Sequence, residues 1–349
     1  MLNRKTEHAS SQRKGWLLLG LVAGVILASG FYFHLRASSV AAPANEVLRN
    51  DPMTAPSMRL DEPLMPIREP TTLDAQKVAL GKLLFHDARL SRDGGVSCAS
   101  CHDLAKGGVD RRARSLGVNG REGEINAPTV YNAAFNFRQF WDGRVGSLEE
   151  QVSGPVLNPV EMANTWDRVL ATLRADVRMA SSFRAIYQSE PTMAAVQDAI
   201  AEFERSLVTP SRMDRWLLGD AGALSDEELE GYRLFRRHGC VACHQGENIG
   251  GNLFQRFGVM QDYFAGKKAT TADLGRYNVT GREEDKYVFK VPSLRNVALT
   301  PPYFHDASTD SLDEAVALMG RFQLGVDLSQ EDVSSIVLFL HTLTGEKLQ

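Results

Sequence analysis

The chain has 349 residues, which predicts two domains at the usual size of about 150 residues each. Hydrophobic residues make up 43% and charged residues 23%, the usage of an ordinary globular protein, which argues against a disordered, collagenous or multi-span membrane chain. The 39 Lys and Arg against 43 Asp and Glu give a net charge of −4. This balance gives no electrostatic support for nucleic-acid binding, so we expect no nucleic-acid partner.

The start of the chain has the pattern of an export segment. An uncharged apolar run at residues 16–33 follows several basic residues, so the positive side is expected to stay in the cytoplasm. The run is just long enough to span a bilayer, which favours an inner-membrane anchor over residues 1–36. Cleavage near residues 39–41 would instead release the chain into the periplasm. Residues 37–70 are rich in Ala, Pro and Ser without apolar periodicity, and are expected to form a tether.

From residue 72 the apolar spacing favours helices joined by short loops, and alternating strand patterns are scarce. The stretches 73–85 and 224–235 share a Gly-x-x-Leu-Phe sequence, and each leads into a cysteine pair. This internal repeat predicts two duplicated domains. Their join is expected near residues 209–223, where Pro and Gly interrupt the pattern. Further helices are expected at 163–175, 193–208, 311–322 and 329–343.

All four cysteines lie in two Cys-x-x-Cys-His sequences, Cys98–His102 and Cys240–His244. This sequence attaches c-type haem: two thiols form thioether bonds to the porphyrin vinyl groups, and the histidine ligates the iron. A thioredoxin-like redox pair or a four-cysteine zinc site would leave both histidines unexplained. Zinc ribbons also separate their pairs by only about 15 to 20 residues.

The sequence therefore predicts two covalently bound c-type haems, attached at Cys98, Cys101, Cys240 and Cys243, with His102 and His244 as proximal iron ligands. The expected fold is mainly α, with two cytochrome c-like haem domains in tandem after the N-terminal membrane anchor or signal segment. The N-terminal haem domain is expected over residues 71–215 and the C-terminal one over residues 216–349.

A haem that stores an electron needs a sixth iron ligand, and a thioether raises its potential. Only Met260 and Met319 follow the second attachment sequence. Met319 shares one expected helix face with Leu312, Ala315 and Val316, which is equally typical of core packing. Met260 lacks such a periodic context and is the weaker candidate.

Several separate sequences resemble the bacterial di-haem cytochrome c peroxidase family, which also includes the methylamine-utilisation di-haem enzymes. They lie at residues 126–136, 139–144, 151, 154–162, 290–297 and 302–306. The resemblance extends over about residues 60–345. It implies that the haem on His102 is the peroxidatic, low-potential centre. The haem on His244 would then be the high-potential electron-transfer centre, with Met319 as its distal ligand.

The resemblance also assigns roles to other side chains. Trp141 matches a tryptophan placed between the haems, and Gln151, Pro155 and Glu161 match residues over the distal face of the peroxidatic haem, with Glu161 as the acid–base residue. From the residues alone, Trp141 could be an ordinary buried aromatic and Glu161 a solvated loop carboxylate. A calcium ion between the domains is implied as well, held by Asn126 and by backbone oxygens of Thr300 and Pro302.

The activity implied is reduction of hydrogen peroxide to water, with electrons from a small periplasmic cytochrome c or cupredoxin. The other expected partners are the membrane, through an uncleaved N-terminal segment, and a second copy of the chain in a homodimer. One alternative is a di-haem oxidase of the methylamine-utilisation type, acting on a protein or organic substrate. Another is a non-catalytic di-haem electron carrier.

One position departs from the family pattern. Most of these peroxidases have a histidine about sixteen residues after the first attachment histidine, which caps the peroxidatic iron in the oxidised state. Val118 stands there, and no histidine occurs between His102 and His238. The haem on His102 is therefore expected to be open without reductive activation. The methylamine-utilisation enzymes also lack the cap, but they have a tyrosine where Met319 is expected at the other haem.

Overall fold

A computed structural model of the protein describes residues 58–346. The described residues all belong to one compact unit. The predicted anchor over residues 1–36 lies outside the described part. Within residues 58–346, no helix is both long and apolar enough to cross a membrane.

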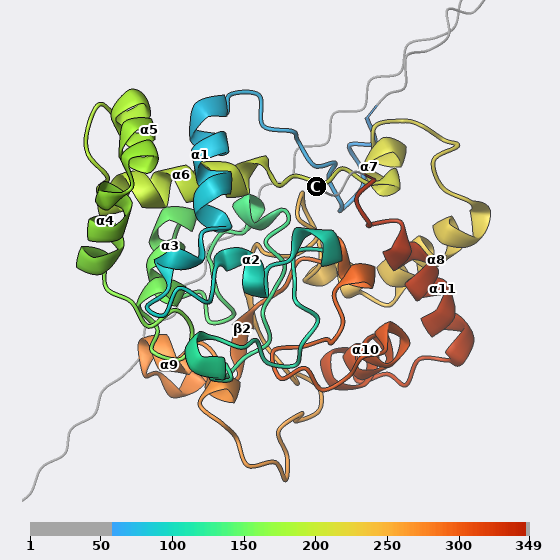
Figure 1. The fold of residues 1–349 in the computed structure, drawn as a ribbon. Helices are drawn as coiled ribbons and strands as arrows, with labels where there is room; N and C mark the ends of the chain where they lie inside the picture. Colours follow the sequence, from blue (N-terminus) through green and yellow to red (C-terminus); the bar gives the residue numbers. More distant parts are fainter. Residues whose placement is uncertain (1–57, 347–349) are drawn as a thin grey trace, which may run out of the picture. The chain divides into compact units, whose positions relative to one another are not determined.

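In the N-terminal half, helix α1 (Ala75–Phe85) packs against α6 (Met193–Ser206), and the two cross at a glycine. A Cβ atom at Gly81 would lie 1.9 Å from the carbonyl oxygen of Ala199, so only glycine permits this approach. Helix α3 (Leu148–Leu157) also packs on α6, while α4 (Trp166–Ala175) and α5 (Val177–Tyr187) form a neighbouring pair (Figure 1). The apolar faces of these helices enclose one continuous core.

The C-terminal half repeats this crossing. Helix α8 (Asp226–Arg237) packs against α11 (Gln330–His341), and a Cβ atom at Gly231 would lie 1.9 Å from the carbonyl oxygen of Ser335. The Leu and Phe of each Gly-x-x-Leu-Phe sequence are buried in the core of their own half. The repeat seen in the sequence is therefore a repeated helix crossing, and in each half a cysteine pair follows the first helix of the crossing.

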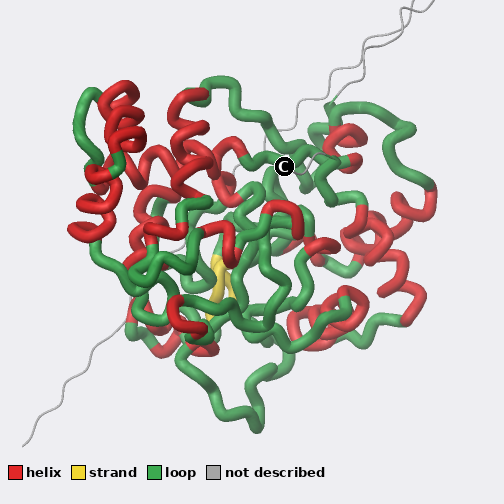
Figure 2. Tube along the Cα trace, viewed as in Figure 1, coloured by secondary structure: helices red, strands yellow, loops and turns green. Residues whose placement is uncertain are grey.

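The remaining elements are short, and loops fill much of the space between the two helix groups (Figure 2). They include α2 (Cys98–Cys101), α7 (Arg212–Leu217), α9 (Tyr277–Thr280) and α10 (Leu312–Met319). Strands β1 (Phe254–Arg256) and β2 (Val288–Lys290) form an antiparallel pair. A π-helical turn at Gly320–Leu324 follows α10. The 3₁₀ turns are Ala88–Leu90, Leu104–Lys106, Val118–Gly120, Ala133–Phe135, Cys240–Ala242, Ala272–Leu274, Glu283–Asp285 and Val297–Leu299.

The prediction of a mainly helical chain is confirmed. Each helix expected from apolar spacing is present, with ends set by capping side chains. Thr165 caps α4, Ser225 and Glu228 form the capping box of α8, and Ser329 caps α11. Helices α3 and α5 were not predicted, and α3 contains Pro155, a residue that ordinarily argues against a helix interior.

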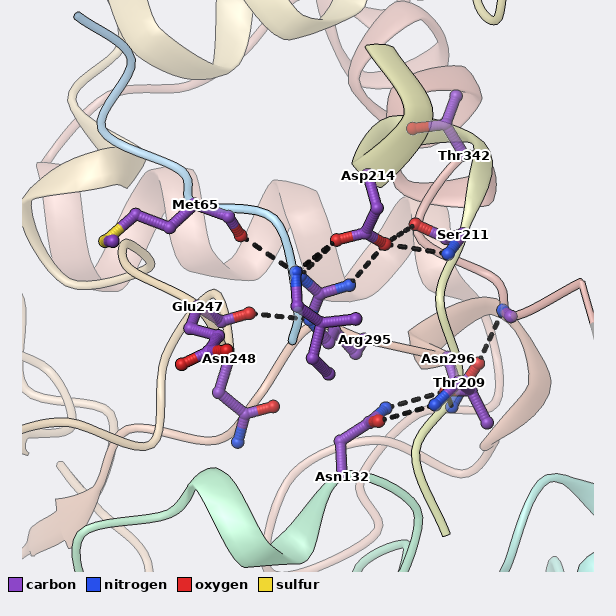
Figure 3. A network of polar contacts seen from close by, with 12 residues as sticks. Met65, Asn132, Thr209, Ser211, Asp214, Glu247, Asn248, Arg295, Asn296 and Thr342 are labelled. Atoms are coloured by element: carbon purple, nitrogen blue, oxygen red, sulfur yellow. Dashed lines mark hydrogen bonds and ion pairs between the residues drawn. The ribbon is translucent and has the colours of Figure 1, made fainter. Parts of the chain in front are cut away.

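Residues 58–70, expected to belong to the tether, pack against the C-terminal half instead. The Leu64 side chain is only 1% exposed and joins the core of α8 and α11. The carbonyl oxygen of Met65 accepts a hydrogen bond from Arg295 Nη2 at 3.2 Å, and Ile67 N donates to Asp214 Oδ1 at 2.7 Å. Arg295 and Asp214 form a buried bidentate ion pair with two contacts of 2.8 Å (Figure 3). Apolar periodicity cannot reveal such a segment, because it is held largely by polar contacts.

Thr209, in the segment expected to join the two halves, contacts residues of both. Thr209 Oγ1 accepts hydrogen bonds from Asn132 Nδ2 at 2.8 Å and from Asn296 Nδ2 at 2.9 Å (Figure 3). Both asparagines are fully buried, have φ near 60° and immediately precede a 3₁₀ turn. Because the two asparagines occupy equivalent places in the two halves, the duplication extends beyond the helices to the seam between them.

Candidate functional site

The first cysteine pair lies on a single helical turn. Ser97 and Ser100 form a capping box that starts α2, with Ser97 N donating to Ser100 Oγ at 3.0 Å. Cys98 and Cys101 occupy the two ends of this turn, and both thiols are free. His102 follows directly, with its Nδ1 3.3 Å from the carbonyl oxygen of Gly108. The turn thus presents two thiols and one imidazole together, as haem attachment requires.

The environment sets the protonation of these groups. Burial raises the pKa of the Cys98 thiol to about 12 and that of Cys101 to about 11, and the carboxylate of Glu161 adds to both shifts. Burial lowers the pKa of His102, so its imidazole is neutral at pH 7. A hydrogen bond from Nδ1–H to the Gly108 carbonyl leaves the lone pair on Nε2 available for iron.

The second cysteine pair follows α8 through Gly239, whose φ is 87°. Cys240 begins a 3₁₀ turn, and Cys243 and His244 come directly after it. Burial lowers the pKa of the His244 imidazole to about 4, which keeps it neutral. Gly250 lies against this ring: a Cβ atom there would be 3.3 Å from His244 Nδ1 and 2.2 Å from the carbonyl oxygen of Pro292. The chain is therefore closely fitted around this histidine.

A cavity of about 420 Å³ opens beside the second pair, within the usual range of about 300–1,000 Å³ for cofactor pockets. Cys240, Cys243, His244 and Met319 line it, together with mainly apolar side chains. Met319 ends α10 at the start of the π-helical turn. Met260 does not line the cavity and is 61% exposed. Thiols, a neutral imidazole and a thioether around one apolar cavity are the donor set of a haem with histidine and methionine ligands, so the residues present fit this cofactor.

Trp141 also lines this cavity. Its Nε1 donates to the carbonyl oxygen of Asn126 at 2.8 Å, and its own carbonyl accepts from Lys290 N at 2.8 Å. The indole meets the rings of Phe289 and His305 edge-on, with centroid separations of 6.4 and 6.3 Å. Trp141 is thus fixed between a loop of the N-terminal half and strand β2 of the C-terminal half.

Glu161 is held in a tight turn near the first cysteine pair. Its backbone N–H donates to the Asn158 carbonyl at 3.1 Å, and its own carbonyl accepts from Val118 N at 2.7 Å. Asn158 Nδ2 also donates to Glu161 Oε1 at 2.6 Å. The carboxyl group is half-buried, and burial raises its pKa although the Asn158 amide favours the ionised form. A carboxyl group with a raised pKa, held rigidly, can both accept and release a proton near neutral pH.

Helix α3 supplies two further predicted residues. Pro155 has no N–H, so the carbonyl of Gln151 lacks its helical partner. The Pro155 carbonyl accepts from Met162 N at 3.1 Å, which ties α3 to the turn that carries Glu161. Within residues 58–346 the Gln151 carboxamide makes no side-chain hydrogen bond, so it is free to bind a ligand.

Val118 occupies the place where a capping histidine was expected. Its side chain is 2% exposed and packs in the core of the N-terminal half with Val152, Val156 and Met162. The neighbouring Gly117 permits close contact with the Glu161 turn, because a Cβ atom there would lie 2.0 Å from the Val160 carbonyl oxygen. The segment at Val118 therefore supports Glu161 and offers no ligand to iron.

Comparison with known proteins agrees with this arrangement. A family model described as di-haem cytochrome c peroxidase matches residues 75–222. The chain is 51% identical over 294 residues to cytochrome c peroxidase Ccp of Escherichia coli, covering 84% of this chain and 63% of that protein. It is 46% identical over 292 residues to cytochrome c551 peroxidase of Nitrosomonas europaea, covering 83% of this chain and 86% of the relative. This chain belongs to the di-haem cytochrome c peroxidase family.

A solved structure has a fold similar to that of this chain. A crystal structure described as a MauG-like protein associated with microbial copper homeostasis superposes with a TM-score of 0.71 at 28% identity, covering 82% of this chain and 95% of the other. The identity is lower than to the two named peroxidases. The chain spans less than two thirds of the E. coli relative, so that protein has further sequence outside the match.

The three residues predicted to hold the calcium ion implied by the family all line one cavity. Asn126, Thr300 and Pro302 all line the cavity beside His244. Asn126 is buried, and its Nδ2 donates to the Arg112 carbonyl at 2.9 Å, which leaves the side-chain oxygen for another partner. Within the described residues, no group of three or more His, Cys, Asp or Glu side chains could hold a metal ion. A calcium ion bound chiefly by amide oxygens stays a prediction.

Sequence reasoning missed two residues of this site. Asn158 lies in the family-like stretch 154–162, but the sequence did not indicate that its side chain would bind the Glu161 carboxylate. Lys290 begins the family-like stretch 290–297, and the sequence did not indicate that this lysine would be buried beside a haem cavity. The Asn158 contact is local, within one turn, whereas the burial of Lys290 depends on packing between segments distant in the sequence. The signal that could have found Lys290 is its place between apolar residues on a short strand.

Proposed function

We propose that this family member reduces hydrogen peroxide to water, using electrons from a small cytochrome c or cupredoxin on the periplasmic side of the inner membrane. One observation carries the proposal. The carbonyl of Glu161 accepts a 2.7 Å hydrogen bond from the backbone N–H of Val118, which stands where the family has a capping histidine, and Asn158 Nδ2 holds the Glu161 carboxylate at 2.6 Å. A carboxyl group suited to acid–base catalysis is therefore fixed beside the position where a capping histidine would stand.

Two c-type haems supply the redox chemistry when bound, by accepting electrons singly and passing them to peroxide. Cys98, Cys101 and His102 would hold one haem in a domain over residues 71–215. Cys240, Cys243, His244 and Met319 would hold the other in a domain over residues 216–349. An N-terminal anchor or cleaved signal, a calcium ion at Asn126, and a homodimer belong to the same proposal.

The side chains over the His102 site would direct proton movement. Glu161, in its ionised form, accepts a proton from the nearer oxygen of peroxide and delivers it to the farther oxygen. The free carboxamide of Gln151 donates a hydrogen bond that orients the peroxide. The O–O bond breaks, and with two electrons and two protons in total each peroxide yields two water molecules. Pro155 acts as a positioning residue by fixing the turn that bears Glu161.

Electrons would enter at the His244 domain and reach the His102 domain through the region of Trp141. This tryptophan contacts residues of both halves and lines the cavity beside His244. Its packing against Phe289 and His305 holds the indole in one orientation. A rigid aromatic ring at this place would keep the distance between the two redox centres constant.

A second candidate is a di-haem oxidase that acts on a protein or organic substrate. Val118 in place of a capping histidine favours it, because an iron open in the resting state needs no activation. The methionine at position 319 disfavours it. Turnover distinguishes the two: a peroxidase consumes peroxide only as fast as a reduced donor protein is supplied, with two donor electrons per peroxide.

The test of the proposal is peroxide turnover by Glu161→Gln with a reduced cytochrome c as donor. Loss of a general acid–base residue is expected to lower kcat about 10²- to 10⁴-fold with the haem content unchanged. Glu124→Gln, at an exposed loop position, is the matched control and is expected to behave as wild type. Unchanged turnover in Glu161→Gln with both haems bound would overturn the acid–base role.

A further inference from the structure

Lys290 is a buried cation without a partner. It ends strand β2, opposite Phe254 of β1, and its side chain is 7% exposed. Within residues 58–346 its ammonium group makes no hydrogen bond and no ion pair, and burial alone lowers its pKa to about 8. A buried ammonium is costly unless it is paired, so an anion absent from the chain itself is expected next to it.

The surroundings indicate where that anion comes from. Lys290 lines the cavity that also contains Cys240, Cys243 and His244. None of the described residues that line this cavity is an aspartate or a glutamate. The cavity is therefore built to receive negative charge from a ligand.

The two arginines that line the cavity, and His305 beside them, already have other partners. Arg295 is paired with Asp214 at 2.8 Å, and His305 Nε2 lies 2.8 Å from Asp273 Oδ1. The guanidinium of Arg256, an exposed residue, lies over the Tyr287 ring, 5.4 Å from its centroid. Lys290 is thus the cation at this cavity that is both buried and unpaired within the described chain.

We propose that the Lys290 ammonium binds a propionate carboxylate of the haem attached at Cys240 and Cys243. This inference rests on the haem attachment proposed above and not on the peroxide reaction. A haem carries two propionates, and an ammonium group forms charge-assisted hydrogen bonds to carboxylates. Pairing removes the cost of the buried charge on Lys290 and holds the haem edge against β2.

The position of Lys290 gives the contact a functional consequence. Its backbone N–H donates to the Trp141 carbonyl at 2.8 Å, so the bound propionate and the indole are fixed by one residue. The positive charge also offsets the propionate charge, which otherwise favours the oxidised, more positive form of the haem. Lys290 therefore raises the reduction potential of the haem that receives electrons and acts as a positioning residue for it.

The test uses the holoenzyme and five variants. Lys290→Met and Lys290→Gln both remove the charge, so the result does not depend on one variant folding. Lys290→Arg keeps the charge. Lys286→Met is the matched control, because Lys286 is paired with Glu283 at 2.7 Å and does not line the cavity. The two readouts are the midpoint potential of each haem in an optical redox titration and the propionate bending band in resonance Raman spectra. The haem on His244 is identified as the one whose potential shifts in Met319→Ala.

Removing the charge is expected to lower the midpoint potential of the His244 haem by at least about 59 mV. For one electron this is a tenfold change in the reduction equilibrium constant. The propionate band is expected to shift in the same variants, to return in Lys290→Arg, and to stay unchanged in Lys286→Met. An unchanged potential or an unchanged band in both neutral variants would overturn the proposal. Absence of haem from Cys240 and Cys243 in the wild type would overturn the proposed haem attachment, and with it this inference. Loss of peroxide turnover without a change in potential or band would count against the proposed function only.

Discussion

Asn158 Nδ2 donates a hydrogen bond of 2.6 Å to Glu161 Oε1, in a turn that also fixes the Glu161 backbone. Burial raises the pKa of Glu161, and the Asn158 amide opposes that rise by stabilising the carboxylate. The two residues together set the pH at which Glu161 can accept a proton. A family resemblance identifies Glu161, but the partner that adjusts it is visible only in the structure.

Asn158→Ala is expected to move the acid limb of the activity profile to higher pH. Glu161 must be ionised to accept a proton, and losing the amide donor destabilises the ionised form. A hydrogen bond to a charged group contributes about 1.5–3 kcal/mol, so the shift is about 1–2 pH units. The measurement is kcat/KM for peroxide against pH. The same limb in wild type and variant would contradict the role of Asn158. Asn278→Ala, at an exposed position of α9 outside the cavity, controls for loss of an asparagine.

Gly117→Ala is expected to impair turnover more than stability. The added Cβ would lie 2.0 Å from the Val160 carbonyl oxygen, so the turn bearing Glu161 must move. A misplacement of about 1 Å near the reacting groups can reduce the rate about 10²-fold. Steady-state kinetics and thermal unfolding are measured together. Gly123→Ala is the matched control: neither glycine has a left-handed φ, and the Cβ added at Gly123 would meet only the Ser115 carbonyl oxygen at 3.5 Å, an ordinary contact. Equal loss of activity in both variants would show that the turn contact is unimportant.

Asp214→Asn is expected to release residues 58–70 and to change the dependence of stability on pH. Arg295 would keep its buried charge without a counter-charge, at a cost of about 3–5 kcal/mol. The Arg295 guanidinium, with hydrogen bonds from Ser211 and Ile67, holds the pKa of Asp214 below its usual value in the folded protein. Its contribution to stability is therefore present above the unfolded pKa of about 3.9 and is lost as pH falls through the lower folded pKa.

The measurement is the unfolding free energy of wild type and Asp214→Asn between neutral and acidic pH. The difference between the two proteins should be largest at neutral pH and should shrink in acid. A difference that does not vary with pH would contradict the assignment of this ion pair. Asp220→Asn, at an exposed site in the following loop, should have little effect at any pH.

Whether a part of the fold can be predicted from the sequence depends on the kind of contact that holds it. The duplicated helix pairs were predictable, because Gly81 and Gly231 stand in the same short sequence before each cysteine pair. The haem attachment residues were predictable because their spacing is dictated by covalent chemistry. Residues 58–70 were not predictable as packed, since their fixation depends on a buried ion pair with partners more than a hundred residues away.

The residues of the candidate site likewise divide into those that the sequence identifies and those that only the structure shows. Glu161, Gln151 and Trp141 follow from resemblance, and the structure gives each a geometry that suits its expected role without testing that role. Spacing favoured Met319 over Met260 but could not distinguish iron ligation from core packing at Met319, because helix-face methionines are common in cores. The structure places Met319 at the cavity and Met260 in solvent. The unpaired charge of Lys290 becomes visible only when every neighbour is known.

The most direct test of the account is an electron paramagnetic resonance spectrum of the fully oxidised, haem-loaded protein, repeated after half-reduction and after peroxide addition. Val118 is buried in the core and offers no iron ligand, so the account predicts a high-spin ferric haem already in the oxidised form. Peroxide should then be consumed promptly, without prior reduction of the other haem. Two low-spin haems, with peroxide consumption appearing only after half-reduction, would contradict the account, because another side chain would then cap the iron on His102.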